Sequence, residues 1–526
     1  MKKLKIVILC GFILGIFNSC TKDFEKINTN PNKTTVGMIQ AYNMFEPILY
    51  NSGNQWLNRT HYYNDELIQF TAFTGGVTRR EHLYYLEESR DWGGFWDHYA
   101  TYGKNIAHMH ELAQKQGDKS LEAIALTFKV LFFSNMTDMF GSIPYEEAFL
   151  SRQPGGTLTP KFNTQKEVYQ LMFADLEAAN DLYASNPTFL NSTMDGMYAG
   201  KMESWRKFNN SLYLRLLCRV SGRTEMTVGT KMTEILGNAT KYPVFTSNLD
   251  NASVKFSGTD PYLSNFGTTT ESEFTSSGRK LTRQLIGMTV QTDQNGFQVY
   301  VDPRLPIIGK KNNVASVNPT NIWIGTKSGC TDLERSIVDK GTSWLNFKIF
   351  CRKDAPATYM DYAEVQFIFA EAALKGLITG STAAAKSYYE AGVRASMEKW
   401  SAQGAYSETP TSITAAQVAT YLASPLGSWD LAANKAEFLG NQKYLALFWV
   451  GMEAYHEYRR TGYPVLTIGE GTQTYNQGIL PTRFGYPPTT MSTNSANAKA
   501  ALTGMGGENN MKTPVWWSKQ AIAEGK

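Results

Sequence analysis

The sequence predicts a mainly α protein, in which long helices form a scaffold and long irregular loops with a few short strands connect them. Two observations predict this fold class. Apolar residues recur at helical spacing in several stretches that also carry helix start and stop signals. Between about residues 221 and 358 this period disappears, and Gly, Ser, Thr, Asn and Asp dominate. Loops this long in a compact protein are usually functional.

Two helices are predicted before this loop insertion. The first starts at a capping box formed by Thr164 and Glu167, after which apolar residues return at helical spacing as far as Leu182. The second is expected to be capped by Ser204 and to carry apolar residues on most of its sides, which implies burial. Trp205 and the stretch "NNSLYLR" are therefore expected in the core.

Three further helices are predicted after the insertion. The stretch "YMDYAEVQFIFAEAALKG" ends at Gly376, and "AAAKSYYEAGVRASMEKW" follows after six residues, which indicates an antiparallel pair. Small residues such as Gly392 at the expected crossing resemble tetratricopeptide units, although the period of about 34 residues is not kept. The stretch "KYLALFWVGMEAYHEYRRTGYP" is expected to form one helix that stops at Gly462. Its Arg459 and Arg460 are expected to pair with buried acids such as Glu364 or Glu371.

The N-terminus has the layout of a secretory signal peptide. Three lysines precede the apolar run 6–17, which is too short to span a bilayer comfortably. The following "FNSC" resembles a bacterial lipobox, in which the cysteine is acylated and becomes the first residue. We therefore expect a signal peptide at 1–19, a tether at 20–32 lipidated on Cys20, and a single domain at 33–526. A plain secreted protein is the alternative.

Composition excludes some classes of function. Removal of the three leader lysines leaves 48 basic against 47 acidic residues, so the mature chain lacks the basic excess of a nucleic-acid-binding protein. Cys218, Cys330 and Cys351 remain after processing, with no C-x-x-C spacing and no even number. They are expected to be buried free thiols, with one bridge possible, and no metal site is predicted.

The sequence carries no strong catalytic motif. G-x-S-x-G, H-E-x-x-H and the phosphate-binding G-x-x-x-x-G-K-[ST] are absent. The nearest match is the S-x-x-K formed by Ser396 and Lys399, but Ser396 falls inside an amphipathic helix and the companion motifs are missing. We therefore expect neither catalysis nor a cofactor.

Eight stretches of the chain occur in a fixed order: "FEKINTNPN", "TDMFGSIPYEEAF", "DGMYAGKMESWRKFNNSLYLRLLCRVS", "DPRL", "AEVQFIFAEAALKG", "YRRTGYPVL", "RFGYPPTTMSTNSAN" and "VWW". In this order they resemble the SusD/RagB family, the surface nutrient-binding lipoproteins of Bacteroidetes. The resemblance covers practically the whole chain after Cys20. It implies a SusD-like fold with four tetratricopeptide-like helix pairs as scaffold and a ligand site carried by loops.

The resemblance also implies a partner and a location. The partner is a SusC-like TonB-dependent outer-membrane transporter, over which the lipoprotein sits as a lid. The protein is then expected at the outer membrane, held by its lipid and exposed at the cell surface. In this account Cys20 anchors the chain, and the polar residues after it form a leash.

The candidate ligand site is predicted from residue chemistry. Oligosaccharides are bound by flat aromatic faces and by polar groups that hydrogen-bond the hydroxyls, and "GGVTRREHLYYLEESRDWGGFW" offers both. Its position before a helix-like stretch resembles that of the family's main binding loop. Two tryptophans of the insertion are expected to reach the same face. The candidates are Arg79, Arg80, Tyr84, Tyr85, Trp92, Trp323 and Trp344.

Two alternatives stay open. The ligand can be an oligopeptide, which the same family also accommodates and which would depend more on backbone hydrogen bonds in a groove. The protein can also be a surface scaffold or adhesion protein that binds no small ligand.

Overall fold

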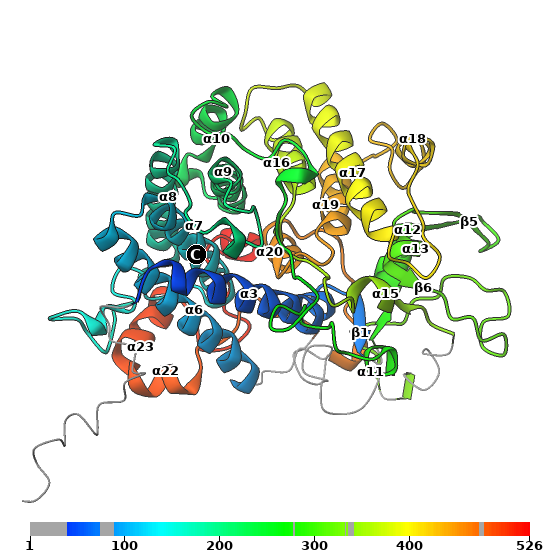
Figure 1. The fold of residues 1–526 in the computed structure, drawn as a ribbon. Coiled ribbons are helices and arrows are strands. Elements are labelled where there is room, and N and C mark those ends of the chain that lie inside the picture. Colours follow the sequence, from blue (N-terminus) through cyan, green and yellow to red (C-terminus); the bar gives the residue numbers. More distant parts are fainter. Residues whose placement is uncertain (1–38, 74–88, 277–278, 332, 335–340, 473–477) are drawn as a thin grey trace, which may run out of the picture.

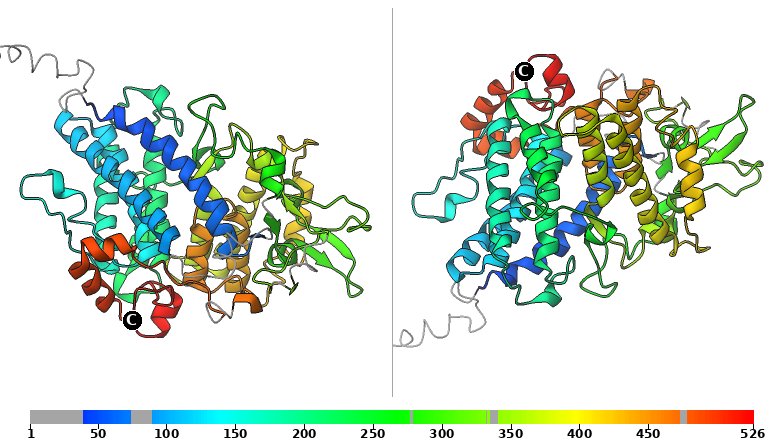
Figure 2. Two further views of the ribbon diagram at one scale, coloured as in Figure 1. Left: turned by 90° about the horizontal axis from the view of Figure 1, so that it is seen from below. Right: turned by 90° about the horizontal axis from the view of Figure 1, so that it is seen from above.

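The computed structural model describes residues 39–73, 89–276, 279–331, 333–334, 341–472 and 478–526. Its scaffold consists of long helices, most of which lie side by side (Figures 1 and 2). These helices are α3 (Tyr42–Arg59), α6 (Ser89–Gln116), α7 (Lys119–Phe140), α8 (Gln165–Ala184), α9 (Met202–Arg219), α16 (Tyr362–Leu374), α17 (Thr382–Gly404), α19 (Lys435–Ala446) and α20 (Glu453–Thr461). The predicted mainly α fold class is confirmed. The predicted signal peptide, the tether and Cys20 lie outside the described residues.

Successive helices pack against each other along the scaffold. Helix α6 contacts α7, α7 contacts α8, α8 contacts α9, α9 contacts α16, and α16 contacts α17. The predicted pair α16–α17 is confirmed, and Gly392 lies at its crossing. A Cβ atom at Gly392 would lie 2.9 Å from the Phe367 ring, so only glycine allows this approach. In Figure 2 the blue to teal helices and the yellow to orange helices form two halves of one array, and the orange-red helices α22 and α23 lie beside the first half.

Local signals set most of the helix ends. The capping box of Thr164 and Glu167 opens α8 as predicted, and Gly376 follows α16 with a φ of +68°. The prediction that Ser204 caps a helix is wrong, because α9 already begins at Met202. The carboxylate of Asp195 explains the earlier start, since it accepts hydrogen bonds from three backbone N–H groups of the preceding turn and from Trp205 Nε1.

The single helix predicted over residues 443–464 is wrong. The chain forms α19 and α20 with an irregular turn between them, in which Trp449 has a φ of +67° and Gly451 a φ of +56°. Trp449 lies 4.3 Å from Phe350, centroid to centroid, and is buried among other rings. Packing of this aromatic segment therefore outweighs the helical preference of its sequence. The predicted stop at Gly462 is confirmed, because this residue is the left-handed cap of α20.

The insertion holds more regular structure than predicted. The elements assigned in its described residues include five short α-helices and most of the strands, among them β5, which matches the expected strand in "GFQVYV". Its helices are α10 (Val228–Gly237), α11 (Glu271–Ser276), α12 (Arg283–Thr289), α13 (Leu305–Ile308) and α15 (Phe347–Phe350). The other short helices of the described chain are α4 (Asp65–Leu67), α18 (Ala415–Ala423), α22 (Pro488–Thr493), α23 (Ser495–Gly504) and α24 (Lys519–Ala523).

The strands form three small antiparallel sheets in the described chain. The largest has four strands in the order β1–β3–β7–β6. Its strands are β1 (Thr71–Phe73), β3 (Arg279–Leu281), β7 (Trp344–Leu345) and β6 (Gly309–Lys310). The two-stranded sheets pair β2 (Ala252–Val254) with β8 (Ala357–Met360) and β4 (Val290–Thr292) with β5 (Gln298–Val301). In Figure 1 the labelled β1, β5 and β6 lie at one end of the molecule, beyond α16 and α17.

One hydrophobic core joins the scaffold and the insertion. Trp205, Phe208 and Leu212 are each 0% exposed, which confirms the predicted core position of this part of α9. The "DPRL" stretch fastens the insertion to the scaffold. The Arg304 guanidinium donates to Asp302 beside it, to Ser396 on α17 and to Tyr421 on α18. Cys218, Cys330 and Cys351 are buried and are not joined by a disulfide, as expected.

Candidate ligand-binding site

The predicted binding segment is held at both ends by described residues. Arg79, Arg80, Tyr84 and Tyr85 lie in 74–88, outside the described residues, and Trp92 belongs to the first turn of α6. The segment leaves the scaffold at β1 and returns at the start of α6. Both of these elements are placed by the short stretch 59–66, which contains a π-helical turn, Thr60–Asn64. Such turns are frequent at functional sites.

The two attachments are specific. On the α6 side, Arg59 Nη2 donates to the Gly94 carbonyl at 2.8 Å, and its guanidinium lies 4.0 Å from the Phe95 ring centroid. On the β1 side, Arg279 of β3 forms an ion pair with Glu66 and lies over the Tyr62 ring at 4.8 Å. Arg279 and Glu66 are buried, so the base of the segment is fixed by packed charges rather than by surface contacts.

The four-stranded sheet presents one row of side chains on its outer face. The register pairs Ala72 with Lys280, Lys280 with Trp344, and Trp344 with Lys310. Directly opposed residues of antiparallel strands point to the same face. Trp344 therefore stands between two lysines, two strands away from the point where the segment 74–88 leaves β1.

Trp344 is more accessible than Trp323. It is half-buried, Lys280 Nζ lies 4.8 Å from its ring centroid, and its Nε1 is buried with no described hydrogen-bond partner. Lys310 Nζ is paired with Glu408 at 2.7 Å. An aromatic ring with an N–H donor to spare and charged groups beside it suits a polyhydroxylated ligand.

The backbone segments that carry Trp323 and Trp344 lie side by side, but the Trp323 ring is on the other face of the sheet. The backbone N–H of Ile324 donates to Ser343 Oγ, which places the two tryptophan segments side by side. A Cβ atom at Gly309 would meet both Leu281 and the Trp323 ring, so this ring lies on the core face. Trp323 is 5% exposed and its ring offers no open face in this structure. The expectation that both rings reach one face is not met, because the Trp323 ring fills the core beneath β6.

An aromatic layer supports the sheet from below. The His61 ring is stacked on Phe274 at 5.1 Å between centroids and contacts Phe266 and Trp449. All four side chains are less than one-tenth exposed. They come from the π-helical turn, the insertion and the turn between α19 and α20, so the layer locks three distant parts of the chain under the candidate site.

Comparison with known proteins identifies the family. The SusD-like family described as "Starch-binding associating with outer membrane" matches residues 31–487. The chain belongs to this family. A chitin-binding protein of known structure is 25% identical, with a TM-score of 0.74, and the match covers 91% of this chain and 99% of that one. No curated protein matches the chain.

Other solved structures share the SusD-like fold. A SusD homologue of Bacteroides fragilis is 24% identical, with a TM-score of 0.75 and coverage of 91% of this chain and 100% of that one. A chitin-binding SusD homologue of Flavobacterium johnsoniae is 23% identical, with a TM-score of 0.71 and coverage of 91% and 98%. The helical scaffold and the insertion described above are therefore those of a SusD-like protein.

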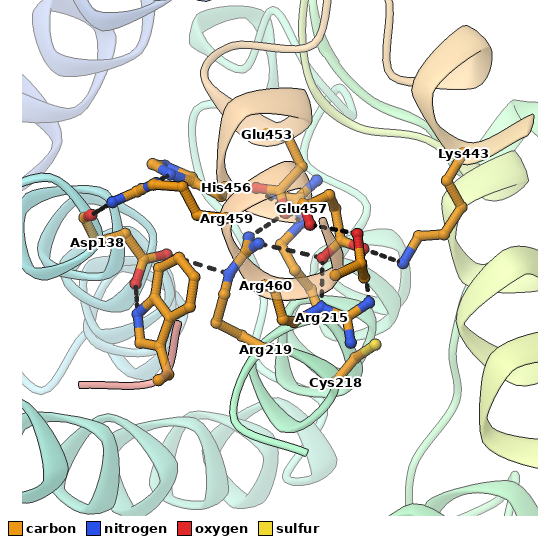
Figure 3. A network of polar contacts seen from close by, with 12 residues as sticks. Asp138, Arg215, Cys218, Arg219, Lys443, Glu453, His456, Glu457, Arg459 and Arg460 are labelled. Carbon is orange, nitrogen blue, oxygen red and sulfur yellow. Dashed lines mark hydrogen bonds and ion pairs between the residues drawn. The ribbon is translucent and has the colours of Figure 1, made fainter. Parts of the chain in front are cut away.

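A cluster of buried charges lies at the centre of this SusD-like scaffold, where α7, α9, α16, α19 and α20 meet (Figure 3). Among the described residues it holds as many cations as acids. The cations are Arg215, Arg219, Lys443, Arg459 and Arg460, and the acids are Asp138, Glu364, Glu371, Glu453 and Glu457. All ten are less than one-tenth exposed, so the cluster is closed to solvent. Its positive and negative charges are equal in number, and it stabilises the scaffold rather than binding a ligand.

The cluster confirms one predicted pairing and corrects another. Arg460 pairs with Glu371 through two hydrogen bonds of 2.7 and 2.6 Å, as predicted. Glu364 instead accepts from Arg215 Nε at 2.6 Å. The predicted pairing of Arg459 with a buried acid is wrong, because its Nη1 donates to the backbone carbonyls of Asp138 and Thr482. Its guanidinium is held between the Tyr455 and Trp517 rings, which the sequence pattern does not reveal.

The S-x-x-K pair is also structural. Ser396 is fully buried and accepts from Arg304, while Lys399 Nζ is bound to Asp361 at 2.6 Å. No group of three His, Cys, Asp or Glu side chains that could hold a metal occurs among the described residues. Helix α7 is long and apolar enough to cross a membrane, but 94% of its most apolar window is buried, as in a core helix.

Proposed function

We propose that this SusD-like protein captures oligosaccharides at the cell surface and delivers them to a SusC-like TonB-dependent outer-membrane transporter. The observation that carries the proposal is the half-buried Trp344, which stands between Lys280 and Lys310 at the base of the segment 74–88. The family description names starch, and the 25% identical relative binds chitin. Starch is a polymer of glucose and chitin a polymer of N-acetylglucosamine. Both have apolar ring faces, which stack on aromatic side chains, and hydroxyls, which form hydrogen bonds.

The proposed site has two parts. The outer face of the sheet supplies the Trp344 ring and its unpartnered Nε1, while Arg79, Arg80, Tyr84, Tyr85 and Trp92 supply the rest from the segment and the first turn of α6. Trp323 is left out of the proposed site because its ring is in the core.

The proposed location follows from the N-terminus. Acylation of Cys20 holds the protein at the outer membrane, with two or more acyl chains on one residue as stable anchoring requires. The family is described as associating with the outer membrane, which supports this location. The polar residues 21–32 would serve as a leash that lets the protein swing over its transporter.

Isothermal titration of the protein that starts after Cys20 tests the ligand class. The panel contains chitin oligosaccharides, starch oligosaccharides, other plant and host glycans, and a protein digest. We expect saturable heat with one glycan class. Heat with the digest alone would replace the oligosaccharide by an oligopeptide, and silence across the whole panel would favour a scaffold or adhesion role.

A further inference from the structure

A pocket of about 400 Å³ opens at the end of α20, away from the sheet, and is lined by cations without acids. Its walls come from α20, from residues 479–482 and from α24. The charged lining residues are Arg459 and Lys519. Tyr458, Leu480 and Pro481 supply apolar walls, and the polar lining residues are Thr482, Ser518 and Gln520. A pocket of this size accommodates a small organic solute.

Arg459 is a buried cation without a carboxylate partner. It is 6% exposed, its Nη1 donates to two backbone carbonyls at 2.7 and 2.8 Å, and its Nη2 contacts His456 Nδ1 (Figure 3). Its Nε is buried and has no hydrogen-bond partner in the described part of the chain. A buried N–H of a charged group that lacks a partner is costly, and an anion in the adjoining pocket would lower this cost through its charge.

The acids near Arg459 are engaged elsewhere. Asp138 accepts from Tyr169 at 2.6 Å and from Trp517 at 2.7 Å, and its other oxygen faces Arg219 Nε at 3.3 Å. Glu457 is bound by Arg460, Arg219 and Lys443 on the far side of α20. Burial lowers the pKa of the Arg459 guanidinium, and the nearby Asp138 opposes this shift only in part.

Lys519 supplies the second cation at the rim of the pocket. It is exposed, its Nζ lies 3.3 Å from the Thr461 carbonyl, and it forms no ion pair with a described residue. Glu524, which directly follows α24, does not line the pocket and is held by Lys526 at 2.8 Å and Gln520 at 2.7 Å. The pocket is therefore positive, with a buried cation in its wall and an exposed ammonium donor at its rim.

We propose that this pocket binds a small oxyanion, namely the carboxylate or sulfate group of an acidic solute. Lys519 can bind such a group through a charge-assisted hydrogen bond, the charge of Arg459 attracts it, and the Ser518 hydroxyl, which only accepts within the described part of the protein, can donate a neutral hydrogen bond. The apolar wall favours a ligand that carries a carbon skeleton. This site is separate from the proposed oligosaccharide site, so either can exist without the other.

Isothermal titration with sodium sulfate, sodium glucuronate and glucose at constant ionic strength tests the proposal. We expect saturable 1:1 binding of sulfate, of glucuronate or of both, and none of glucose; the comparison of the two anions shows whether the carbon skeleton contributes. Lys519 is exposed, so Lys519→Glu leaves the buried cluster intact. This variant should bind the anion more weakly, on the order of tenfold.

Lys499→Glu is the matched control. This lysine is exposed on α23, does not line the pocket, and its replacement makes the same change of net charge. It should leave the affinity unchanged. The proposal is overturned by the absence of saturable anion binding, by equal binding of glucose, or by an equal loss of affinity in the two lysine variants.

Discussion

Glu371 is the acid on which two cations of the central cluster and the half-exposed Lys375 converge. It accepts from Arg460 at 2.7 and 2.6 Å, from Lys375 at 2.6 Å and from Lys443 at 3.3 Å. These cations lower the pKa of its carboxyl well below the usual range. Glu371→Gln removes the charge and leaves the buried Arg460 and Lys443 to share Glu457 alone, so we expect a loss of about 3–5 kcal/mol in the free energy of unfolding. Urea denaturation of both proteins measures it.

The control is an acid of similar helical setting at the surface. Glu390 lies 3.9 Å from Lys386 and 3.6 Å from Arg394, on the exposed side of α17. Glu390→Gln should cost less than about 1 kcal/mol. Equal losses in the two variants would show that the central cluster contributes no more than surface ion pairs.

Asp65 should make stability fall as the pH rises. It is fully buried beside Glu66, with Arg279 and Tyr444 facing it from β3 and α19, and burial raises its pKa from 3.8 to about 8. The folded protein thus keeps a proton that the unfolded chain releases above pH 3.8. The contribution of this protonated carboxyl to the free energy of unfolding is fully present below pH 3.8 and is lost as the pH rises through about 8.

Asp65→Asn removes this titration while keeping the shape of the side chain. We expect the stability of the variant relative to the parent protein to rise between pH 5 and pH 8. In this range the folded parent must either hold a proton that the unfolded chain releases or bury a charged carboxylate, and the variant does neither. Urea midpoints at the two pH values give the difference. Asp97→Asn, at an exposed position of α6, should show no such change, and a parallel pH response of Asp65→Asn and the parent would contradict the assigned pKa.

At the scale of elements, the turn between α19 and α20 depends on Gly451. Its φ is +56°, and a Cβ atom there would lie 2.4 Å from the Trp56 indole. Gly451→Ala should therefore destabilise the protein by about 2 kcal/mol or more through backbone strain and overpacking. Gly504→Ala is the control, since nothing lies within 4 Å of its Cβ position at the end of α23, and it should be neutral or stabilising. Thermal unfolding of both variants gives the comparison, and equal melting temperatures would refute the strain argument.

Helices with local signals could be predicted from the sequence, and elements set by distant contacts could not. The capping box of Thr164 and the glycine after α16 define helix ends within a few residues, so α8 and α16 are found by their patterns. The break near Trp449 escapes such a pattern, because no proline interrupts "KYLALFWVGMEAYHEYRR" and the contact of Trp449 with Phe350 joins residues about a hundred positions apart.

The candidate site shows the same division. Trp344 could be selected from residue type and its place in a long insertion, but its neighbours could not. Lys280 and Lys310 become its neighbours only through the pairing of strands of two or three residues, which carry no alternating pattern. The burial of Trp323 depends on the same register, since it decides which face of the sheet each ring takes. The Arg459 pocket likewise joins elements that are distant in sequence.

At the scale of the whole molecule, we propose that acylation of Cys20 determines where the protein is held. Cys20→Ala removes the thiol that this proposal requires and changes no residue of the described fold. We expect the wild-type protein in the outer-membrane fraction, accessible to protease added to intact cells, and the variant in soluble fractions. Radiolabelled fatty acid should mark only the wild type. A variant that remains with the membrane to the same extent would argue for attachment through a partner instead of lipid.

The central claim is that the outer face of the sheet, at the base of the segment 74–88, binds an oligosaccharide. The most direct test is isothermal titration of Trp344→Ala with the glycan that the wild-type protein binds, beside Tyr406→Ala, an exposed aromatic residue whose face is covered by Arg352. Loss of stacking should weaken binding by about 1–2 kcal/mol, or roughly five- to thirtyfold, in the first variant and leave the second unchanged. Full affinity in Trp344→Ala, with the fold intact by circular dichroism, would contradict the account.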